Sequence, residues 1–220
     1  MKRIAALISG EGRNLQAILD ACADGRIPAR VVSVISNRAS APGLQRAERA
    51  GVPTRILEHG AYPSREAYDQ ALVQALDASA PDILVLAGFM RILTPVFTRR
   101  YHGRALNIHP SLLPRHPGLN THQRVLDSGE AEHGATVHFV TDALDGGPRV
   151  IQGAFTVGAQ DDAQTLAERV MHEIELKIFP QAIAWMARDE LTLDTALNLR
   201  FRGRLLDAPL GLADLTPEFR

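Results

Sequence analysis

Short apolar runs alternate with amphipathic stretches from the N-terminus to about residue 110. This alternation is typical of β-α-β units that build a parallel sheet with helices on both faces. Five runs are predicted to be strands: residues 4–9, 31–35, 54–57, 83–87 and 105–108. The fourth run is apolar throughout, as a strand buried on both faces is expected to be. The pattern therefore predicts an α/β fold with an open, mostly parallel, doubly wound sheet.

The stretches between these runs have the spacing of amphipathic helices. Residues 14–23, 43–50 and 65–78 are predicted to be helical. Ser64 near the start of the third stretch and Gly51 just past the end of the second are capping signals. Each of the three fits a helix that crosses over between neighbouring parallel strands.

The pattern changes after residue 107, where prolines interrupt the chain. Pro110, Pro114 and Pro117 exclude a single regular element and predict a loop at the end of a strand. Residues 134–140 then alternate, and a further strand is predicted at 151–157 beyond a glycine-rich turn. These two runs predict an antiparallel strand pair appended to the parallel sheet.

The last third of the chain contains one strong pattern. A long helix is predicted from Asp161, and Pro180 is expected to bend or end it. The tail at 188–220 is weakly patterned, and no repeat, linker or low-complexity tract interrupts the chain. We expect one domain over residues 1–220, with a core at about 3–187.

Composition narrows the class of partner. The 24 Lys and Arg against 25 Asp and Glu give a net charge of -1, which does not favour nucleic acid. One cysteine, Cys22, excludes an intrachain disulfide and points to a reducing compartment, so a cytoplasmic location is expected. No run approaches the roughly 18 apolar residues of a membrane span. Small-molecule substrates are the expected partners, and both a monomer and a homodimer remain open.

A glycine-rich segment at 9–15 stands between the first strand and the first helix. Glycines there let backbone N–H groups approach a phosphate at a helix N-terminus, although a tight turn also needs flexible residues. A dinucleotide site fits less well, because Leu15 replaces the third glycine and no acidic residue follows the second strand near Asn37. Arg38 could accommodate a phosphorylated ribose, so a site for NADP remains an alternative.

Six of the eight histidines fall between His102 and His138, but their spacing lacks a metal-binding pattern, and no metal is expected. His109 differs from the others because Asn107 lies on the same side of the predicted strand, at its carboxyl end. An amide and an imidazole together suit a carbonyl that develops negative charge, which favours acyl-type transfer. Asp142 and Asp145 are the candidate carboxylates for raising the pKa of the imidazole.

Three segments around these residues carry a family resemblance. Asn-Ile-His-Pro-Ser-Leu-Leu-Pro at 107–114, His-Gly-Ala-Thr-Val-His-Phe-Val at 133–140 and Leu-Asp-Gly-Gly-Pro at 144–148 resemble the folate-dependent formyltransferases. The resemblance is narrowed to the phosphoribosylglycinamide formyltransferases of purine synthesis by three further segments, at 8–16, 64–69 and 86–93. It covers about residues 3–187.

The resemblance implies transfer of the formyl group of 10-formyltetrahydrofolate, as co-substrate, to the primary amine of 5'-phosphoribosylglycinamide in de novo purine (IMP) biosynthesis, without a metal. The implied catalytic group is Asn107, His109 and Asp145. The residues implied to bind the phosphate and the glycinamide are Gly12, Arg13, Asn14 and Glu175. The residues implied to bind the folate are Arg65, Met90, Arg91, Ile92, Leu93, Asn107, Val140 and Asp145.

Three positions depart from the family pattern. Asn120 replaces a usual His, Arg13 replaces a usual small residue, and Glu11 adds a carboxylate to a phosphate loop. Glu11 is expected to point away from the phosphate or to pair with Arg13, and we favour a role of Arg13 in masking Glu11 over direct phosphate contact.

Two alternatives to this function are weighed. Formyltetrahydrofolate hydrolase and methionyl-tRNA formyltransferase use the same scaffold, but both normally carry an extra domain that 220 residues are not expected to hold. A non-catalytic folate- or nucleotide-binding module would not need the trio of Asn107, His109 and Asp145.

Overall fold

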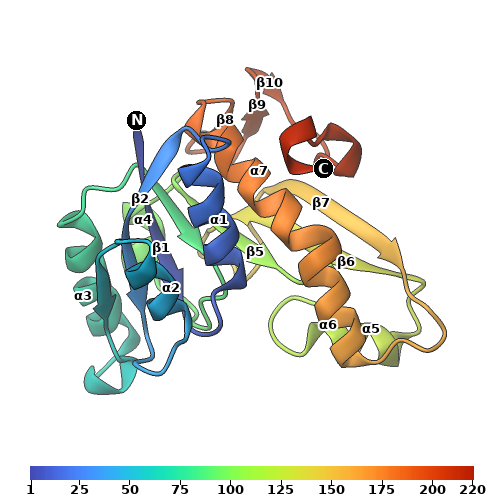
Figure 1. The fold of residues 1–220 in the computed structure, drawn as a ribbon, viewed down its shortest axis with the longest axis horizontal. Coiled ribbons are helices and arrows are strands. Elements are labelled where there is room, and N and C mark those ends of the chain that lie inside the picture. Colours follow the sequence, from blue (N-terminus) through green and yellow to red (C-terminus); the bar gives the residue numbers. More distant parts are fainter.

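The computed structural model describes residues 1–220 and is built around a seven-stranded sheet (Figure 1). The strands are β1 Lys2–Ile8, β2 Ala29–Ser36, β3 Thr54–Ile56, β4 Ile83–Leu86, β5 Ala105–His109, β6 Glu132–Phe139 and β7 Arg149–Thr156. They lie in the order β3-β2-β1-β4-β5-β6-β7. Strands β1 to β5 pair in parallel, whereas β6 and β7 add an antiparallel pair. The predicted α/β sheet with its appended strand pair is confirmed.

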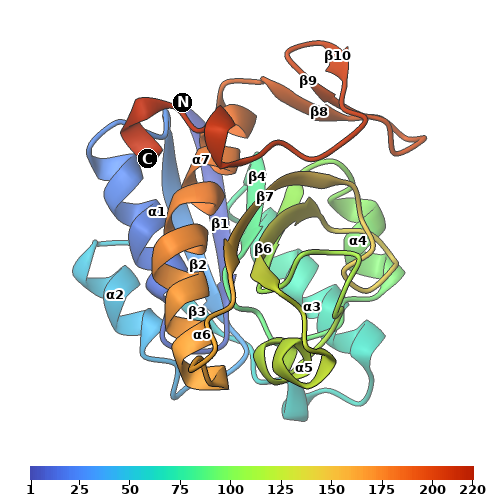
Figure 2. The ribbon, with the colours of Figure 1, turned by 90° about the vertical axis from the view of Figure 1, so that its right-hand side faces the viewer.

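Helices cover both faces of this sheet, as the alternation predicted (Figure 2). They are α1 Arg13–Ala23, α2 Gly43–Arg49, α3 Arg65–Asp77, α4 Pro95–Arg100, α5 Thr121–Ser128, α6 Ala163–Arg169 and α7 Leu176–Ala187, with the short turns η1 His59–Ala61, η3 Leu212–Asp214 and η4 Pro217–Phe219. Strand β1 shows the two faces directly. Ile4, Ala6 and Ile8 join the core beneath α1 and α7, whereas Ala5 and Leu7 join the core beneath α3 and α4.

Helix α7 continues through Pro180, so the prediction that this proline would end the helix is wrong. Ten of the twelve residues of α7 are buried, and this packing outweighs the one backbone hydrogen bond that a proline removes. The irregularity lies upstream, where Val170–Glu175 (η2) is a π-helical turn. Such turns are rare and often carry functional residues.

Two helices were not predicted from the sequence. The six-residue α4 and the eight-residue α5 are too short for an apolar period to repeat convincingly. Helix α5 follows the proline-rich loop, which was predicted correctly as irregular, and ends at Gly129 in the left-handed conformation. No helix in the structure combines the length and the apolar character needed to span a membrane.

The tail after α7 forms a second, antiparallel sheet of β8 Leu191–Leu193, β9 Leu199–Phe201 and β10 Arg204–Leu205. It packs on the end of α7, where the ring of Phe201 lies 5.0 Å from that of Trp185. Leu210 then exchanges backbone hydrogen bonds with Val150 and Gln152 of the edge strand β7. The tail therefore covers part of an edge that would otherwise be open to pairing.

The order of the strands creates a switch point between β1 and β4. From β1 the chain builds outward through β2 and β3, and from β4 it builds in the other direction through β5. Open α/β sheets place their ligands at the carboxyl ends of strands around such a point. The glycine-rich loop after β1 and the loop at 87–94 after β4 flank this crevice.

Candidate active site

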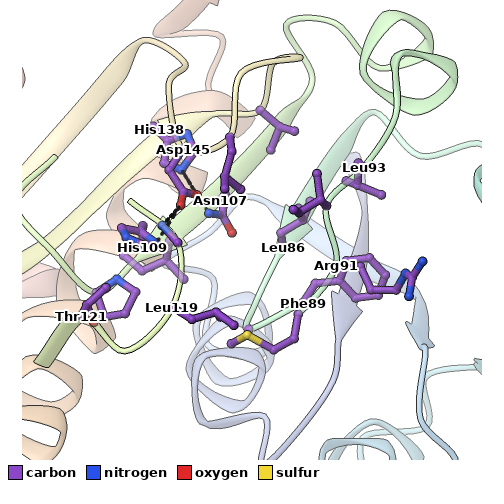
Figure 3. A pocket seen from close by; sticks show the side chains of 18 of the residues that line it. Leu86, Phe89, Arg91, Leu93, Asn107, His109, Leu119, Thr121, His138 and Asp145 are labelled. Carbon is purple, nitrogen blue, oxygen red and sulfur yellow. Dashed lines mark hydrogen bonds and ion pairs between the residues drawn. The ribbon is translucent and has the colours of Figure 1, made fainter. Parts of the chain in front are cut away.

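A cavity of about 580 Å³ opens at the carboxyl ends of β4 and β5, beside the loop that follows β6 (Figure 3). The volume lies in the range typical of small-molecule sites. Every residue that the sequence suggested for catalysis or for the folate lines this cavity: Arg65, Met90, Arg91, Ile92, Leu93, Asn107, His109, Val140 and Asp145.

His109 and Asp145 face each other inside the cavity. The Nδ1 atom of His109 lies 3.4 Å from Oδ2 of Asp145, and both side chains are almost fully buried. Asp145 has a left-handed backbone conformation with φ of 49°, and it accepts a hydrogen bond of 2.8 Å from the backbone N–H of Gly118. The carboxylate of Asp145 is therefore held by the loop after β5 as well as by the turn in which Asp145 lies.

The ionisation of this pair follows from its surroundings. Burial lowers the pKa of His109, against the opposing effects of a backbone hydrogen bond to His116 and the charge of Asp145. For Asp145 burial acts to raise the pKa, but His138, the Gly118 N–H and the charge of His109 together hold the pKa below its usual value. Asp145 is thus an anion near neutral pH and favours the protonated form of His109, but burial outweighs this effect, so the expected net rise in the pKa of His109 is not found.

Asn107 is oriented by a histidine on the neighbouring strand. Asn107 and His138 are partners in the β5–β6 register, and Nδ2 of Asn107 lies 3.0 Å from Nε2 of His138. Nδ1 of His138 lies 2.9 Å from the carbonyl oxygen of Phe139, which can only accept, so this nitrogen donates. In the neutral ring Nε2 then accepts from Asn107, which leaves the second amide hydrogen of Asn107 for another acceptor. In the charged ring Nε2 carries hydrogen and faces Oδ1 of Asp145 at 3.6 Å, which is the form that lowers the pKa of Asp145.

The remainder of the cavity is an apolar wall with cationic groups at its edge. Met90 and Ile92 are 58% and 48% exposed, so their apolar side chains are open to the cavity that they line. The guanidinium of Arg91 stacks over the ring of Tyr68 at 4.9 Å, and Arg65 is exposed at the start of α3. The wall can receive a flat apolar group, and the arginines can receive an anion.

The residues implied for phosphate and glycinamide, Gly12, Arg13, Asn14 and Glu175, do not line this cavity but lie at the same edge of the sheet, beyond β1. Gly12 has φ of 74°, and a Cβ atom there would stand 2.7 Å from the Cα of Gly43, so the close approach of these two segments requires glycine. The N–H groups of this loop and of the start of α1 remain available to an anion.

Asn14 and Glu175 form a buried polar pair. Nδ2 of Asn14 donates to Oε2 of Glu175 at 2.6 Å, while Oδ1 of Asn14 is buried without a partner. Burial raises the pKa of Glu175 to about 7, although the Asn14 hydrogen bond acts to lower it. A buried oxygen without a partner beside a buried carboxyl group is suited to accept the N–H or O–H groups of a polar ligand.

The expected pairing of Arg13 with Glu11 is wrong. Nη1 of Arg13 instead forms an ion pair with Oε2 of Glu168, on α6, at 2.7 Å. The Glu11 side chain is exposed, and its carbonyl oxygen accepts from Nε of Arg46. The sequence offered no signal for this arrangement, because the two partners are 155 positions apart.

Sequence reasoning also missed two groups that touch the reactive trio. His138 was noted only as part of a motif, although its alternation with Thr136 already placed it on one face of β6. The N–H of Gly118 could not be inferred, since a backbone donor leaves no trace in residue type. No group of three or more His, Cys, Asp or Glu side chains is arranged to hold a metal ion.

An open α/β sheet that brings an amide, an imidazole and a carboxylate into one cavity is typical of an enzyme that acts at a carbonyl carbon. Residues 2–183 match the family described as formyl transferase, and the chain belongs to this family. It is 52% identical over 190 residues to the phosphoribosylglycinamide formyltransferase of Escherichia coli (strain K12), over 86% of this chain and 89% of that protein.

Solved structures give the same result. The phosphoribosylglycinamide formyltransferase of Coxiella burnetii, determined in complex with CHES, superposes with a TM-score of 0.90 at 43% identity, over 96% of this chain and 98% of that one. The glycinamide ribonucleotide transformylase 1 of Symbiobacterium toebii superposes with a TM-score of 0.88 at 46% identity, over 91% and 94% of the two chains.

Proposed function

We propose that this protein transfers the formyl group of 10-formyltetrahydrofolate to the primary amine of 5'-phosphoribosylglycinamide, a step of purine biosynthesis. The observation that carries the proposal is the convergence of Asn107, His109 and Asp145 in one cavity with an apolar wall. The names of the similar proteins support the same reaction. The pterin would lie against Met90 and Ile92, and the glutamate carboxylate of the folate would meet Arg65 or Arg91.

The glycinamide ribonucleotide would occupy the crevice beyond β1. Backbone N–H groups at Gly12, Arg13 and Asn14 would hold its phosphate at the start of α1. Glu175 and the free Oδ1 of Asn14 would accept hydrogen bonds from the glycinamide part. This arrangement directs the amine toward the carboxyl ends of β4 and β5, where the formyl group would stand.

The reaction then proceeds by addition and elimination. The amine nitrogen attacks the formyl carbon, a C–N bond forms, and the carbonyl electron pair moves onto oxygen. The free amide hydrogen of Asn107 and protonated His109 stabilise this oxyanion, and Asp145 stabilises the imidazolium. The oxyanion collapses as the bond to N10 of the folate breaks. His109 gives its proton to N10 and then takes up the proton lost by the attacking nitrogen, which restores the charged ring.

The test is an assay of the purified protein with 10-formyltetrahydrofolate, with and without the glycinamide ribonucleotide, followed by folate absorbance. Formyl consumption that depends on the amine, with one formylated product for each tetrahydrofolate released, is the expected result. Consumption at the same rate without the amine would identify a hydrolase instead. The alternatives on the same scaffold thus give a different dependence on the acceptor.

A control variant checks that the assay reports this cavity. Asp145→Asn should abolish most of the turnover, because the anion that stabilises His109 is removed. Asp127→Asn changes an exposed carboxylate on the nearby helix α5 and should leave turnover unchanged. Equal losses in the two variants would contradict the proposed site.

A further inference from the structure

The second ring nitrogen of His109 is bound by the proline-rich loop. Nε2 of His109 lies 2.9 Å from the carbonyl oxygen of His116. A carbonyl oxygen can only accept, so Nε2 carries hydrogen whether the ring is neutral or charged. The nitrogen that gains and loses the proton is then Nδ1, which faces Asp145 at 3.4 Å.

The carbonyl of His116 is turned inward because its side chain is held outside. His116 has a left-handed backbone with φ of 53°, which is uncommon for a residue with a side chain. Its Nε2 atom lies 2.6 Å from Oε1 of Glu130, and the other carboxylate oxygen of Glu130 lies 2.6 Å from Nη1 of Arg115. The His116 and Glu130 side chains are 12% and 20% exposed, so this pair is less accessible to solvent than a typical surface ion pair.

The first part of the same loop is also fixed to the sheet. Thr136 of β6 is fully buried, and its hydroxyl donates to the carbonyl of Ser111 at 2.7 Å while it accepts from the N–H of Leu113 at 3.1 Å. Arg124 of α5 donates to the carbonyl of Pro117 at 2.6 Å. The side-chain contact that holds residue 116 itself is the one with Glu130.

We propose that His116 and Glu130 are positioning residues, which hold the His116 carbonyl against Nε2 of His109 and so make Nδ1 the nitrogen that works at the reacting carbon. The inference rests on the proposed function, because it concerns how His109 acts in formyl transfer. The ring of His116 and the carboxylate of Glu130 act through the loop backbone and do not touch the substrates.

The chemical consequence is a defined orientation of the imidazole. When the ring is charged, its Nδ1–H points into the space between Asp145 and the cavity, where an oxyanion can share it. Without the His116 carbonyl the neutral ring could carry its hydrogen on either nitrogen, and it could rotate about its bond to the backbone. Either change removes a fraction of the enzyme from the productive state.

Other ionisable groups lie near His109 and His116, and the test variants must leave them unchanged. The groups that influence the pKa of His109 are Asp145, His138 and Arg124, in addition to the His116 carbonyl. The groups that face His116 are Glu130 and Arg115, with His133 nearby. The variants below leave all of these residues except His116 and Glu130 in place.

Two variants remove the contact from its two sides. Glu130→Ala deletes the anchor, and His116→Asn keeps a residue type that tolerates the left-handed backbone but lacks the reach to Glu130. Glu130→Gln retains an acceptor for His116 and should rescue most of the activity. Glu132→Gln, an exposed carboxylate two positions along the chain, is the matched control.

The first readout needs no turnover. Nitrogen-15 spectra of labelled histidine rings should show the neutral form of His109 with hydrogen on Nε2 in the wild type, and a mixture of tautomers in Glu130→Ala and His116→Asn. Loss of the carbonyl acceptor should also lower the pKa of His109, because the hydrogen bond to the His116 carbonyl acts to raise it. Because the spectra are taken without substrate, they test the positioning role even if formyl transfer is not the reaction.

The second readout is kinetic. Both disruptive variants should lose roughly ten- to a hundred-fold in kcat, with little change in KM for the glycinamide ribonucleotide or the folate. Rates are compared per folded protein, with melting curves recorded for every variant. A His109 that keeps its tautomer and pKa in both variants would overturn the proposal. So would an unchanged kcat, or a rise in KM alone, which would show that the contact shapes the cleft and does not orient the ring.

Discussion

Glu175→Gln should make the protein more stable at pH 8 than the wild type, but not at pH 4.5. Glu175 is 4% exposed, and its main polar contact is Nδ2 of Asn14 at 2.6 Å. Glutamine has nearly the same shape and can still accept the Asn14 hydrogen bond. The substitution therefore removes the burial of a negative charge while it preserves the packing.

The size of the effect follows from proton linkage. Burial raises the pKa of Glu175 from its usual value of 4.5 to about 7. The folded protein holds this proton more tightly than the unfolded chain, so the contribution to stability is complete below pH 4.5. It is lost as the pH rises through 7. A difference of 2.5 pH units at about 1.4 kcal/mol per unit gives a change of about 3 kcal/mol in the free energy of unfolding.

The assay is urea unfolding at pH 4.5, 6 and 8, followed by the fluorescence of the only tryptophan. Trp185 is fully buried on α7, so its emission reports the opening of the core. The free energy of unfolding of Glu175→Gln, minus that of the wild type, should grow by about 3 kcal/mol from pH 4.5 to pH 8.

Glu173→Gln serves as the control, because Glu173 is exposed on the same π-helical turn. The difference between this variant and the wild type should change little over the same pH range. Parallel curves for Glu175→Gln and the wild type would refute the reasoning, since they would mean that the Glu175 carboxylate is not penalised by the fold. A difference that shrinks as the pH rises would refute it as well.

Three further outcomes are expected at the site. His109→Ala and Asp145→Asn should each lower kcat by about 10² or more with a much smaller change in KM, because both residues act on charge that develops in the transition state. A variant that kept half of the wild-type kcat in steady-state kinetics would contradict this. Arg91→Ala should raise KM for the folate and leave KM for the glycinamide ribonucleotide unchanged. The reverse pattern would show that Arg91 lies on the side of the cleft that binds the glycinamide ribonucleotide. Glu168→Gln should tighten glycinamide ribonucleotide binding by up to about ten-fold in calorimetry, because Arg13 is freed for the phosphate. Arg13→Ser in the same background should abolish that gain, and a gain that persists would show that Arg13 does not contact the phosphate.

Most of the sheet was predictable because its pattern is strong and local. The run at 83–87 is apolar throughout and became β4 at Ile83–Leu86, and the run at 134–140 alternates and became β6 at Glu132–Phe139. Helix α4 and the strands of the tail are too short for a period to repeat and were not predicted. The equally short β3 was predicted because it follows the helical stretch at 43–50 in the β-α-β alternation. The prediction that Pro180 would end the helix was wrong for another reason, because the tertiary packing of α7 outweighed a local helix-breaking signal.

The part of the site that lies on one strand could be predicted from residue order alone. Asn107 and His109 share a face because side chains on a strand alternate, and both line the cavity. The contacts that orient them could not be predicted in this way. The partner of Asn107 depends on the β5–β6 register, and the acceptor for His109 is a backbone carbonyl in a loop. Such partners are determined by the fold and not by residue type.

The two halves of the site lie on different segments, yet a buried hydrogen-bond network fixes one against the other. Ser9, at the end of β1, donates to Oδ1 of Asn37 at 2.6 Å and accepts from the backbone N–H of Met90 at 2.8 Å. The loop that would hold the phosphate and the wall that would hold the pterin are therefore joined at the switch point of the sheet. Formyl transfer needs the amine and the formyl carbon within about 3–3.5 Å of each other before reaction. Because β1 and β4 are paired in register up to Leu7 and Leu86, the sheet fixes the spacing of the two loops on which that separation would depend.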